Sequence, residues 1–122
     1  GIAGLAFKSG TDDLRESPMV RVAEALLGKG FEVHLFDSNV SLSRLMGANK
    51  AYIEREIPHL SRLLRSDLSQ VIEASDIFVI ANRDGVTSEA LGGLRRRHRV
   101  VDLIRILPEE FRSRVRYEGL YW

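Results

Sequence analysis

The stretch Ile2-Ala3-Gly4-Leu5-Ala6-Phe7 is a short, nearly continuous apolar run. Runs of this kind are typical of strands that are buried on both faces of a parallel sheet. Val33-His34-Leu35-Phe36 predicts a second strand, which stops at Asp37. Because a helical pattern lies between the two, this part of the chain predicts a right-handed, parallel strand–helix–strand unit.

The helix between these strands has recognisable ends. Ser17-Pro18 suits its start, with the serine as the N-cap and the proline at the first helical position. Apolar residues then recur on one helical face from Met19 to Leu27. Gly28-Lys29-Gly30 follows, where a C-cap glycine and a cation are both favoured. The pattern therefore predicts one amphipathic helix that packs on the sheet.

Strands and helices continue to alternate along the rest of the chain. Ile77-Phe78-Val79-Ile80-Ala81 is the least ambiguous buried strand. Further strands are expected at 63–64, 100–103 and 117–122 (the last alternatively an extended tail), and helical segments at 42–46, 51–57 up to a stop at Pro58, 67–74, 89–97 and 108–112. This alternation predicts an α/β fold: a three-layer, Rossmann-like open parallel sheet of about five strands with helices on both faces.

Length and composition limit the function classes. The chain has 122 residues, 44% of them hydrophobic and 29% charged, as expected for a single globular domain over residues 1–122. Its net charge of +1 creates no field that would attract nucleic acid or acidic lipid. It has no apolar run that could cross a bilayer, no signal segment and no cysteine, which excludes disulfides and thiolate chemistry. We therefore expect a cytoplasmic domain that binds neither nucleic acid nor membrane.

A Rossmann-like sheet prompts a search for the dinucleotide fingerprint, whose glycines let a pyrophosphate approach a helix N-terminus. The fingerprint is missing, because the glycines after the first strand are Gly4 and Gly10, with the bulky Phe7 and Lys8 between them. Lys8-Ser9 also resembles the end of a phosphate-binding P-loop. However, Phe7 replaces the glycine before the lysine and the spacing is too short, so this motif is rejected as well.

The loop after the first strand nevertheless carries two cations, Lys8 and Arg15. They follow the carboxyl end of the strand and precede a helix N-terminus, at the edge where open parallel sheets bind ligands. Two cations there would suit a phosphate or pyrophosphate. The alternative is that both only pair with nearby carboxylates of a structured loop. Thr11-Asp12-Asp13 favours turns and backbone capping over a paired-carboxylate acid/base site.

Three other features have a structural interpretation beside a functional one. Asp37 ends the second strand, where a dinucleotide domain places its ribose-binding acid, but without the fingerprint an N-cap or turn role is favoured. Arg95-Arg96-Arg97-His98-Arg99 is a dense positive run that suits a solvated helix end better than a phosphate or RNA patch. His34, His59 and His98 lack the spacing of a metal site, so no metal is expected.

The loop after the first strand also carries a family pattern. Gly4-Leu5-Ala6-Phe7-Lys8, followed by Thr11-Asp12-Asp13-Leu14-Arg15-Glu16-Ser17-Pro18, resembles the C-terminal domain of the UDP-glucose/GDP-mannose dehydrogenase family. The resemblance continues through Phe36-Asp37, Gly47-Ala48-Asn49-Lys50-Ala51-Tyr52-Ile53-Glu54, Ile57-Pro58-His59-Leu60, Ser66-Asp67-Leu68, Ala74-Ser75-Asp76 and Glu118-Gly119-Leu120-Tyr121-Trp122. The stretch from residue 47 to residue 59 resembles the GDP-mannose branch of the family more than the UDP-glucose branch.

This resemblance implies part of an NAD-dependent enzyme that oxidises the C6 alcohol of a nucleotide sugar, GDP-mannose or UDP-glucose, to a carboxylate. In the family, an N-terminal Rossmann domain holds most of the NAD and a cysteine outside the C-terminal domain forms the covalent intermediates. Lys8 matches the lysine that contacts the sugar nucleotide, and Arg15 matches the arginine that reaches the NAD side. The implied partners are the nucleotide sugar and the enzyme's own N-terminal domain, within a homo-oligomer. Without a cysteine, this chain holds no catalytic residue and is expected to be inactive alone.

Two segments depart from the family pattern. Val101-Asp102-Leu103-Ile104-Arg105 stands where the UDP-glucose branch has a Gly-Arg element, so Arg105 does not inherit the role of that arginine. Residues 83–99 depart as well, which leaves open whether Asn82 and its neighbours contact the base or the ribose. The alternative function is a non-catalytic nucleotide-binding or oligomerisation module that uses the same edge of the sheet.

Overall fold

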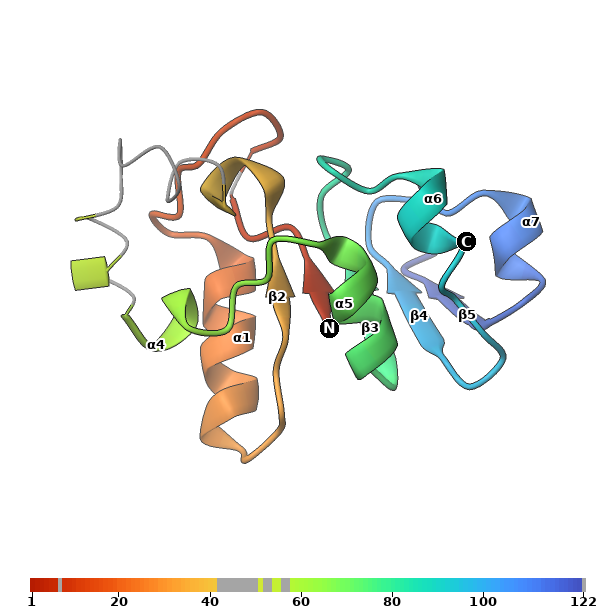
Figure 1. Ribbon diagram of the computed structural model, residues 1–122, viewed down its shortest axis with the longest axis horizontal. Coiled ribbons are helices and arrows are strands. Elements are labelled where there is room, and N and C mark those ends of the chain that lie inside the picture. Colours follow the sequence, from red (N-terminus) through yellow and green to blue (C-terminus); the bar gives the residue numbers. More distant parts are fainter. Residues whose placement is uncertain (7, 42–50, 52–53, 56–57, 122) are drawn as a thin grey trace.

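The computed structural model describes residues 1–6, 8–41, 51, 54–55 and 58–121. In these ranges five strands form one sheet in the order β2-β1-β3-β4-β5, with every pairing parallel (Figure 1). The strands are β1 (Ile2–Ala3), β2 (Leu35–Phe36), β3 (Ile77–Ile80), β4 (Arg99–Asp102) and β5 (Arg116–Gly119). The helices are α1 (Pro18–Gly28), α4 (Pro58–Ser61), α5 (Leu68–Ala74), α6 (Ser88–Leu91) and α7 (Glu109–Arg112). The predicted parallel α/β sheet is confirmed.

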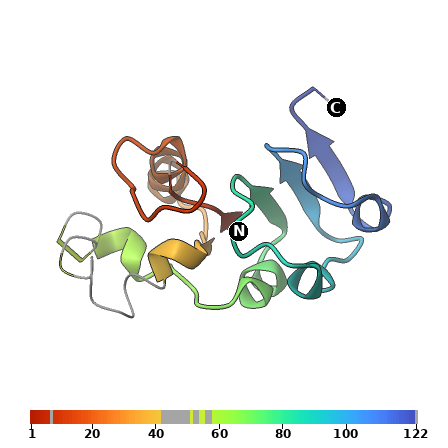
Figure 2. The ribbon, with the colours of Figure 1, turned by 90° about the horizontal axis from the view of Figure 1, so that it is seen from above.

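Helices cover both faces of the sheet, so the domain has three layers (Figure 2). α1 lies on one face, over β1 and β2, while α5, α6 and α7 lie on the other. Each face has its own apolar core, and one core includes Ile2, Leu5, Val20 and Leu35, the other Ala3, Val71, Phe78 and Ile80. Ile2 and Ala3 belong to different cores because successive side chains of a strand point to opposite faces.

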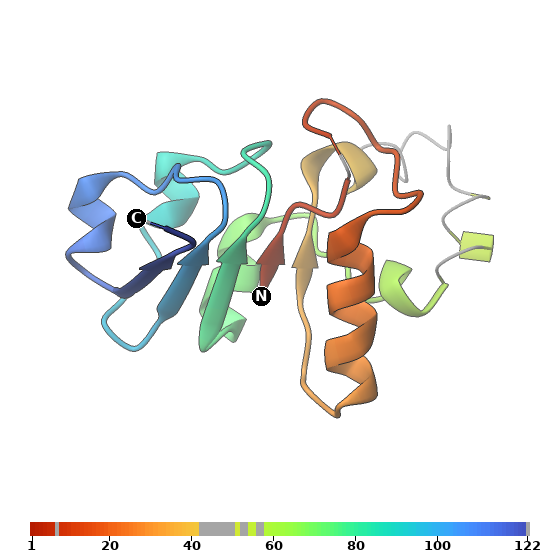
Figure 3. The ribbon, with the colours of Figure 1, turned by 180° about the vertical axis from the view of Figure 1, so that it is seen from behind.

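The helical cover is uneven. From behind, α1 lies over the β1–β2 half of the sheet, and the described residues place no helix over the same face of β3, β4 and β5 (Figure 3). Ile77 of β3 is accordingly 50% exposed although its type and its central strand favour burial. Val79, two residues further along that face, is partly buried against the α1 core.

The ends of α1 differ in how well they match the predictions. Pro18 is the first helical residue and Ser17 has the extended backbone of an N-cap. The Ser17 hydroxyl does not cap the helix, however, but donates to the buried carbonyl oxygen of Leu5. At the other end Gly30 adopts φ +85 and closes a Schellman motif, as the glycine pattern predicts.

Several predicted boundaries are wrong, for local reasons. The helix expected at 89–97 ends at Leu91 because Gly92 and Gly93 follow it. Pro58 begins α4, since proline fits the first helical position well, while of the helix expected at 51–57 the described residues 51, 54 and 55 are helical. The strand expected at 63–64 is a single parallel bridge between Leu64 and Leu35. The helical segment expected at 42–46 lies outside the described residues.

Among the residues that the structure describes, no helix is long and apolar enough to cross a membrane.

Candidate functional site at the carboxyl edge of the sheet

The strand order creates a topological switch between β1 and β3. β1 leads into α1 on one face of the sheet, whereas β3 leads into α6 on the other (Figure 2). In open parallel sheets, ligands bind outside the carboxyl ends of the strands at such a switch. Residues 8–17, here called the β1 loop, and residues 81–87, the β3 loop, flank this point. The candidate site is therefore built from these two loops.

The two strands meet at Gly4 and Asn82. The Ala3 carbonyl oxygen accepts from the backbone N–H groups of Ala81 at 2.8 Å and Asn82 at 3.3 Å. Gly4 has φ +100, and a Cβ atom on it would lie 2.3 Å from the Asn82 Cβ and 2.6 Å from the Asn82 nitrogen. Glycine is thus required at position 4 both by the backbone conformation and by the lack of space.

Asp84 joins the β1 loop to the β3 loop. The Ser9 hydroxyl lies 2.8 Å from both the Asn82 Oδ1 and the Asp84 Oδ1 and donates to these acceptors. The Gly10 N–H and the Asn39 side-chain amide donate to the Asp84 Oδ2 at 2.5 and 2.7 Å. The Gly10 amide foremost, and then the Ser9 hydroxyl, hold the pKa of Asp84 below its usual range because they stabilise its charged form. Asp84 thereby fixes the start of the β1 loop against the end of β3.

Asp37 has the turn role that the sequence favours. Its Oδ2 accepts from the backbone N–H groups of Leu5 at 2.8 Å and Ala6 at 2.9 Å. Its Oδ1 accepts from those of Asn39 at 3.0 Å and Val40 at 3.1 Å, at the start of the helical turn 38–41. With both oxygens engaged and 2% exposure, this carboxylate is structural in the present conformation and not presented to a ribose.

Lys8 is exposed at the start of the β1 loop. Its carbonyl oxygen accepts from the Thr11 hydroxyl at 2.9 Å, which confirms the turn role predicted for Thr11. Within the described part of the chain, no carboxylate pairs with the Lys8 ammonium group. Lys8 therefore presents its charge to solvent at the carboxyl edge, while its backbone is held by the turn.

Arg15 is paired locally, as the alternative interpretation of the loop expects. Its Nε and Nη2 donate to the two carboxylate oxygens of Asp13 at 2.9 and 3.0 Å. This side-chain contact lowers the pKa of Asp13 to about 2. The Arg15 side chain is 74% exposed, so solvent screens and weakens this ion pair. A ligand phosphate could therefore replace Asp13 at small cost.

Comparison with known proteins agrees with the pattern in the β1 loop. Residues 1–109 match the UDP-glucose/GDP-mannose dehydrogenase family, UDP binding domain. The chain belongs to this family.

Its relatives include members of both branches. The GDP-mannose 6-dehydrogenase of Pseudomonas syringae pv. tomato is 48% identical over 121 residues, 99% of this chain and 28% of the relative. That of Pseudomonas aeruginosa is 46% identical over 122 residues, 100% of this chain and 28% of the relative. The UDP-glucose 6-dehydrogenase of Rickettsia typhi is 29% identical over 118 residues, 93% of this chain and 25% of the relative. The chain thus spans between 25% and 28% of the length of these enzymes.

A solved structure has the same fold. A crystal structure of a ternary complex of GDP-mannose dehydrogenase from Pseudomonas aeruginosa matches with a TM-score of 0.81 and 43% sequence identity. The match covers 100% of this chain and 28% of that one. The family segment at 47–54, which resembles the GDP-mannose branch, lies almost wholly outside the described residues.

Asp84 is the residue of the site that sequence reasoning missed, and the sequence leaves the role of Asn82 open. The available signal was their position, because Asn82-Arg83-Asp84-Gly85 directly follows the buried strand β3. Polar residues directly after a central parallel strand fall at the ligand edge. Gly85 adopts φ +74, and a Cβ on it would lie 2.8 Å from the Phe36 ring, so the β3 loop is also held against β2.

Arg105 also follows the carboxyl end of a strand, but neither it nor the other singled-out residues take part in the hydrogen bonds that join the β1 and β3 loops. Arg105 has φ +57 in the exposed turn after β4. The Arg95–Arg99 run leads into β4, which begins at Arg99, and lies at the opposite edge of the sheet. His34 and His59 contact Glu32 and Glu24, and no group of three metal-ligating side chains exists among the residues that the structure describes.

Gly4→Ala tests the contact between β1 and β3. We expect it to lower the free energy of unfolding by about 2–4 kcal/mol, because the new Cβ requires a rare φ and overlaps Asn82. Gly10→Ala is the matched control, since Gly10 also has a positive φ, +75, but nothing lies within 4 Å of an added Cβ. Urea unfolding followed by circular dichroism measures both variants. Equal losses would show that the close contact adds nothing to the conformational cost.

Proposed function

We propose that residues 1–122 are the C-terminal, nucleotide-sugar-binding domain of an NAD-dependent dehydrogenase that oxidises GDP-mannose to the corresponding uronic acid. The observation that carries the proposal is the position of the family's β1 loop at the switch between β1 and β3, with Lys8 exposed there. The chain spans 28% of the GDP-mannose 6-dehydrogenases that it resembles. The remainder of the enzyme would then supply the domain that holds most of the NAD, within a homo-oligomer.

Lys8 would bind the diphosphate of the nucleotide sugar. A diphosphate carries its negative charge on a compact group of oxygens, which an ammonium group recognises as a point charge. The first turn of α1 lies just beyond the β1 loop, and no side chain caps it. Its free N–H groups and the positive end of the helix dipole would add to the attraction of the diphosphate.

Arg15 would contact the NAD side of the cleft. Its guanidinium group is exposed and its contact with Asp13 is screened by solvent, so a phosphate oxygen of the cofactor can compete with this carboxylate. The chain lacks the glycine fingerprint that binds a dinucleotide pyrophosphate, and Asp37 is engaged by four backbone N–H groups. The residues present thus fit one cofactor contact and not a complete NAD site.

Two features favour GDP-mannose over UDP-glucose as the substrate. The GDP-mannose 6-dehydrogenases are 46% to 48% identical to this chain, whereas the UDP-glucose 6-dehydrogenase of Rickettsia typhi is 29% identical. The segment 47–59 also has the character of the GDP-mannose branch.

The chain alone is expected to be inactive. It has no cysteine to form the covalent intermediates, and it carries only one side of the proposed cleft. Incubation of the purified chain with GDP-mannose and NAD, followed at the absorbance of NADH, measures this. Steady NADH formation by the chain would contradict the proposed division of labour.

Lys8→Ala tests the substrate site. Calorimetric titration of the chain with GDP-mannose should show binding that weakens about tenfold in this variant, because one charge-assisted contact is lost. Arg15→Ala should leave GDP-mannose affinity within about twofold and weaken the binding of NAD. The matched control is Lys29→Ala, since Lys29 lies at the other end of α1, away from the carboxyl edge.

Titration with GDP, GDP-mannose and UDP-glucose separates this proposal from a UDP-glucose domain and from an oligomerisation module. Tighter binding of GDP and GDP-mannose than of UDP-glucose is expected for the GDP-mannose branch. Binding of GDP-mannose that is equal in wild type and Lys8→Ala would remove Lys8 from the site. Absence of any nucleotide binding would favour an oligomerisation module.

A further inference from the structure

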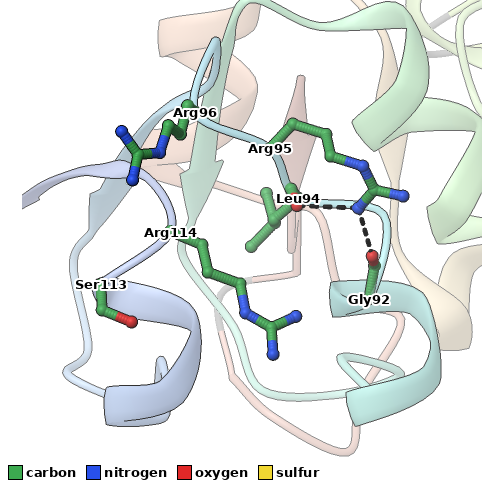
Figure 4. A pocket seen from close by; sticks show the side chains of 6 residues that line it. All are labelled: Gly92, Leu94, Arg95, Arg96, Ser113 and Arg114. Carbon is green, nitrogen blue, oxygen red and sulfur yellow. Dashed lines mark hydrogen bonds between the residues drawn. The ribbon is translucent and has the colours of Figure 1, made fainter.

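A second group of cations surrounds a surface cavity of about 480 Å³, here called the arginine pocket (Figure 4). Its lining residues are Gly92, Leu94, Arg95, Arg96, Ser113 and Arg114. They belong to the segments that lead into β4 and β5, so the pocket lies at the amino edge of the sheet. The β1 loop lies at the carboxyl edge. The arginine pocket is therefore separate from the proposed nucleotide-sugar site.

Nearby arginines that do not line the pocket are used inside the fold. Arg97 donates to the carbonyl oxygens of Ser75 and Glu73 at 2.9 and 2.7 Å. Arg99 pairs with Glu118 at 3.1 Å. These contacts anchor α5 and β5, and they explain part of the dense positive run by structure alone.

The arginines of the pocket lack such carboxylate partners. Among the described residues, no carboxylate lies within ion-pair distance of Arg95, Arg96 or Arg114. Arg95 donates through Nη1 to the carbonyl oxygens of Gly92 and Leu94 at 2.5 and 2.9 Å, which leaves its other N–H groups available. Cations gathered without a counter-charge repel one another, and a bound anion would relieve that repulsion.

The backbone under Arg95 is held firmly. The Arg95 N–H donates to the Nδ1 of His98 at 2.8 Å, and the His98 Nε2 donates to the Ile72 carbonyl oxygen at 3.1 Å. His98 is fully buried, and burial foremost, with the nearby Arg97 charge, lowers its pKa, so that the imidazole is neutral and keeps Nδ1 as an acceptor. A buried histidine thus fixes one wall of the pocket before any ligand arrives.

The side chains are arranged for a small ligand and not for a long polymer. In Figure 4 the side chains of Arg95 and Arg114 extend toward α6, whereas that of Arg96 points to the opposite side. Leu94 is 1% exposed and Ser113 adds a hydroxyl group at the rim. The cavity volume falls within the range of small-molecule sites, roughly 300–1,000 Å³. No aromatic residue lines the pocket, so it offers no surface on which nucleic-acid bases could stack.

We propose that the arginine pocket binds the phosphate group of a small phosphorylated ligand. The Arg95 and Arg114 guanidinium groups bind the phosphate oxygens, because their planar forks match phosphate geometry. Arg96 supplies further positive charge at the rim. This site goes beyond the proposed function, which uses only the carboxyl edge of the sheet.

Inorganic pyrophosphate is the probe for this proposal. It is titrated into the ¹⁵N-labelled 122-residue chain while the backbone amide shifts are followed by NMR. We expect saturating shifts at Arg95, Arg96, Ser113 and Arg114. Arg95→Gln and Arg114→Gln should each weaken this binding about tenfold, because each removes one charge-assisted phosphate contact. Raising the salt concentration should weaken it as well.

Two control variants test whether the effect is specific to the pocket, and an RNA oligomer serves as a second probe. Arg21→Gln, an exposed arginine on α1, should leave the pocket shifts unchanged, and so should Lys8→Ala, which affects only the carboxyl edge. Absence of shifts at the pocket amides at millimolar pyrophosphate would overturn the proposal. Binding that survives both Arg95→Gln and Arg114→Gln would do the same. So would much tighter binding of a single-stranded RNA oligomer with shifts that spread to Arg97 and Arg99, since that would indicate a nucleic-acid surface.

Discussion

The buried carboxylate of Asp37 holds together the strand ends on which the candidate site depends. Its two oxygens accept the backbone N–H groups of Leu5, Ala6, Asn39 and Val40. These bonds compensate for the loss of water around a charge that is 2% exposed. They also set where the chain leaves β1 and where the helical turn after β2 begins.

From Asp37 a continuous set of hydrogen bonds crosses the carboxyl edge. Asn39, positioned by Asp37, donates to Asp84, and Asp84 accepts from Ser9 and Gly10 in the β1 loop. The ends of β2, β1 and β3 are thereby connected through side chains as well as through the sheet. The exposed Lys8 is thus carried on a loop whose position is determined by buried and half-buried groups.

Asp102 is a second buried carboxylate that accepts backbone N–H groups, here at the end of β4. It is fully buried and accepts from the backbone N–H groups of Ile104 and Leu107 at 3.2 and 2.9 Å, with the Tyr117 hydroxyl at 3.3 Å. Arg105, with φ +57, lies inside the turn that these bonds close. The departure from the family's Gly-Arg element therefore falls in a tightly organised turn, which presents Arg105 to solvent.

The fold was largely predictable because its strands are short apolar runs and its helices have local start and stop signals. β3 and α5 depend on such signals, and so does the turn role of Asp37. The long-range contacts were not predictable from local patterns. Ser17 fits an N-cap by its neighbours, yet its hydroxyl contacts Leu5, and nothing near Asp84 in the sequence reveals that its partners are Ser9 and Gly10.

The amino edge of the sheet carries the arginine pocket, and the carboxyl edge carries the β1 and β3 loops. The central proposal is that the nucleotide sugar binds at the carboxyl edge. The most direct test is an NMR map of the ¹⁵N-labelled chain during titration with GDP-mannose, which also detects weak binding. We predict that the largest shifts fall on the amides of residues 8–10 and 82–85. Shifts confined to other regions, with these amides unchanged at saturation, would contradict it.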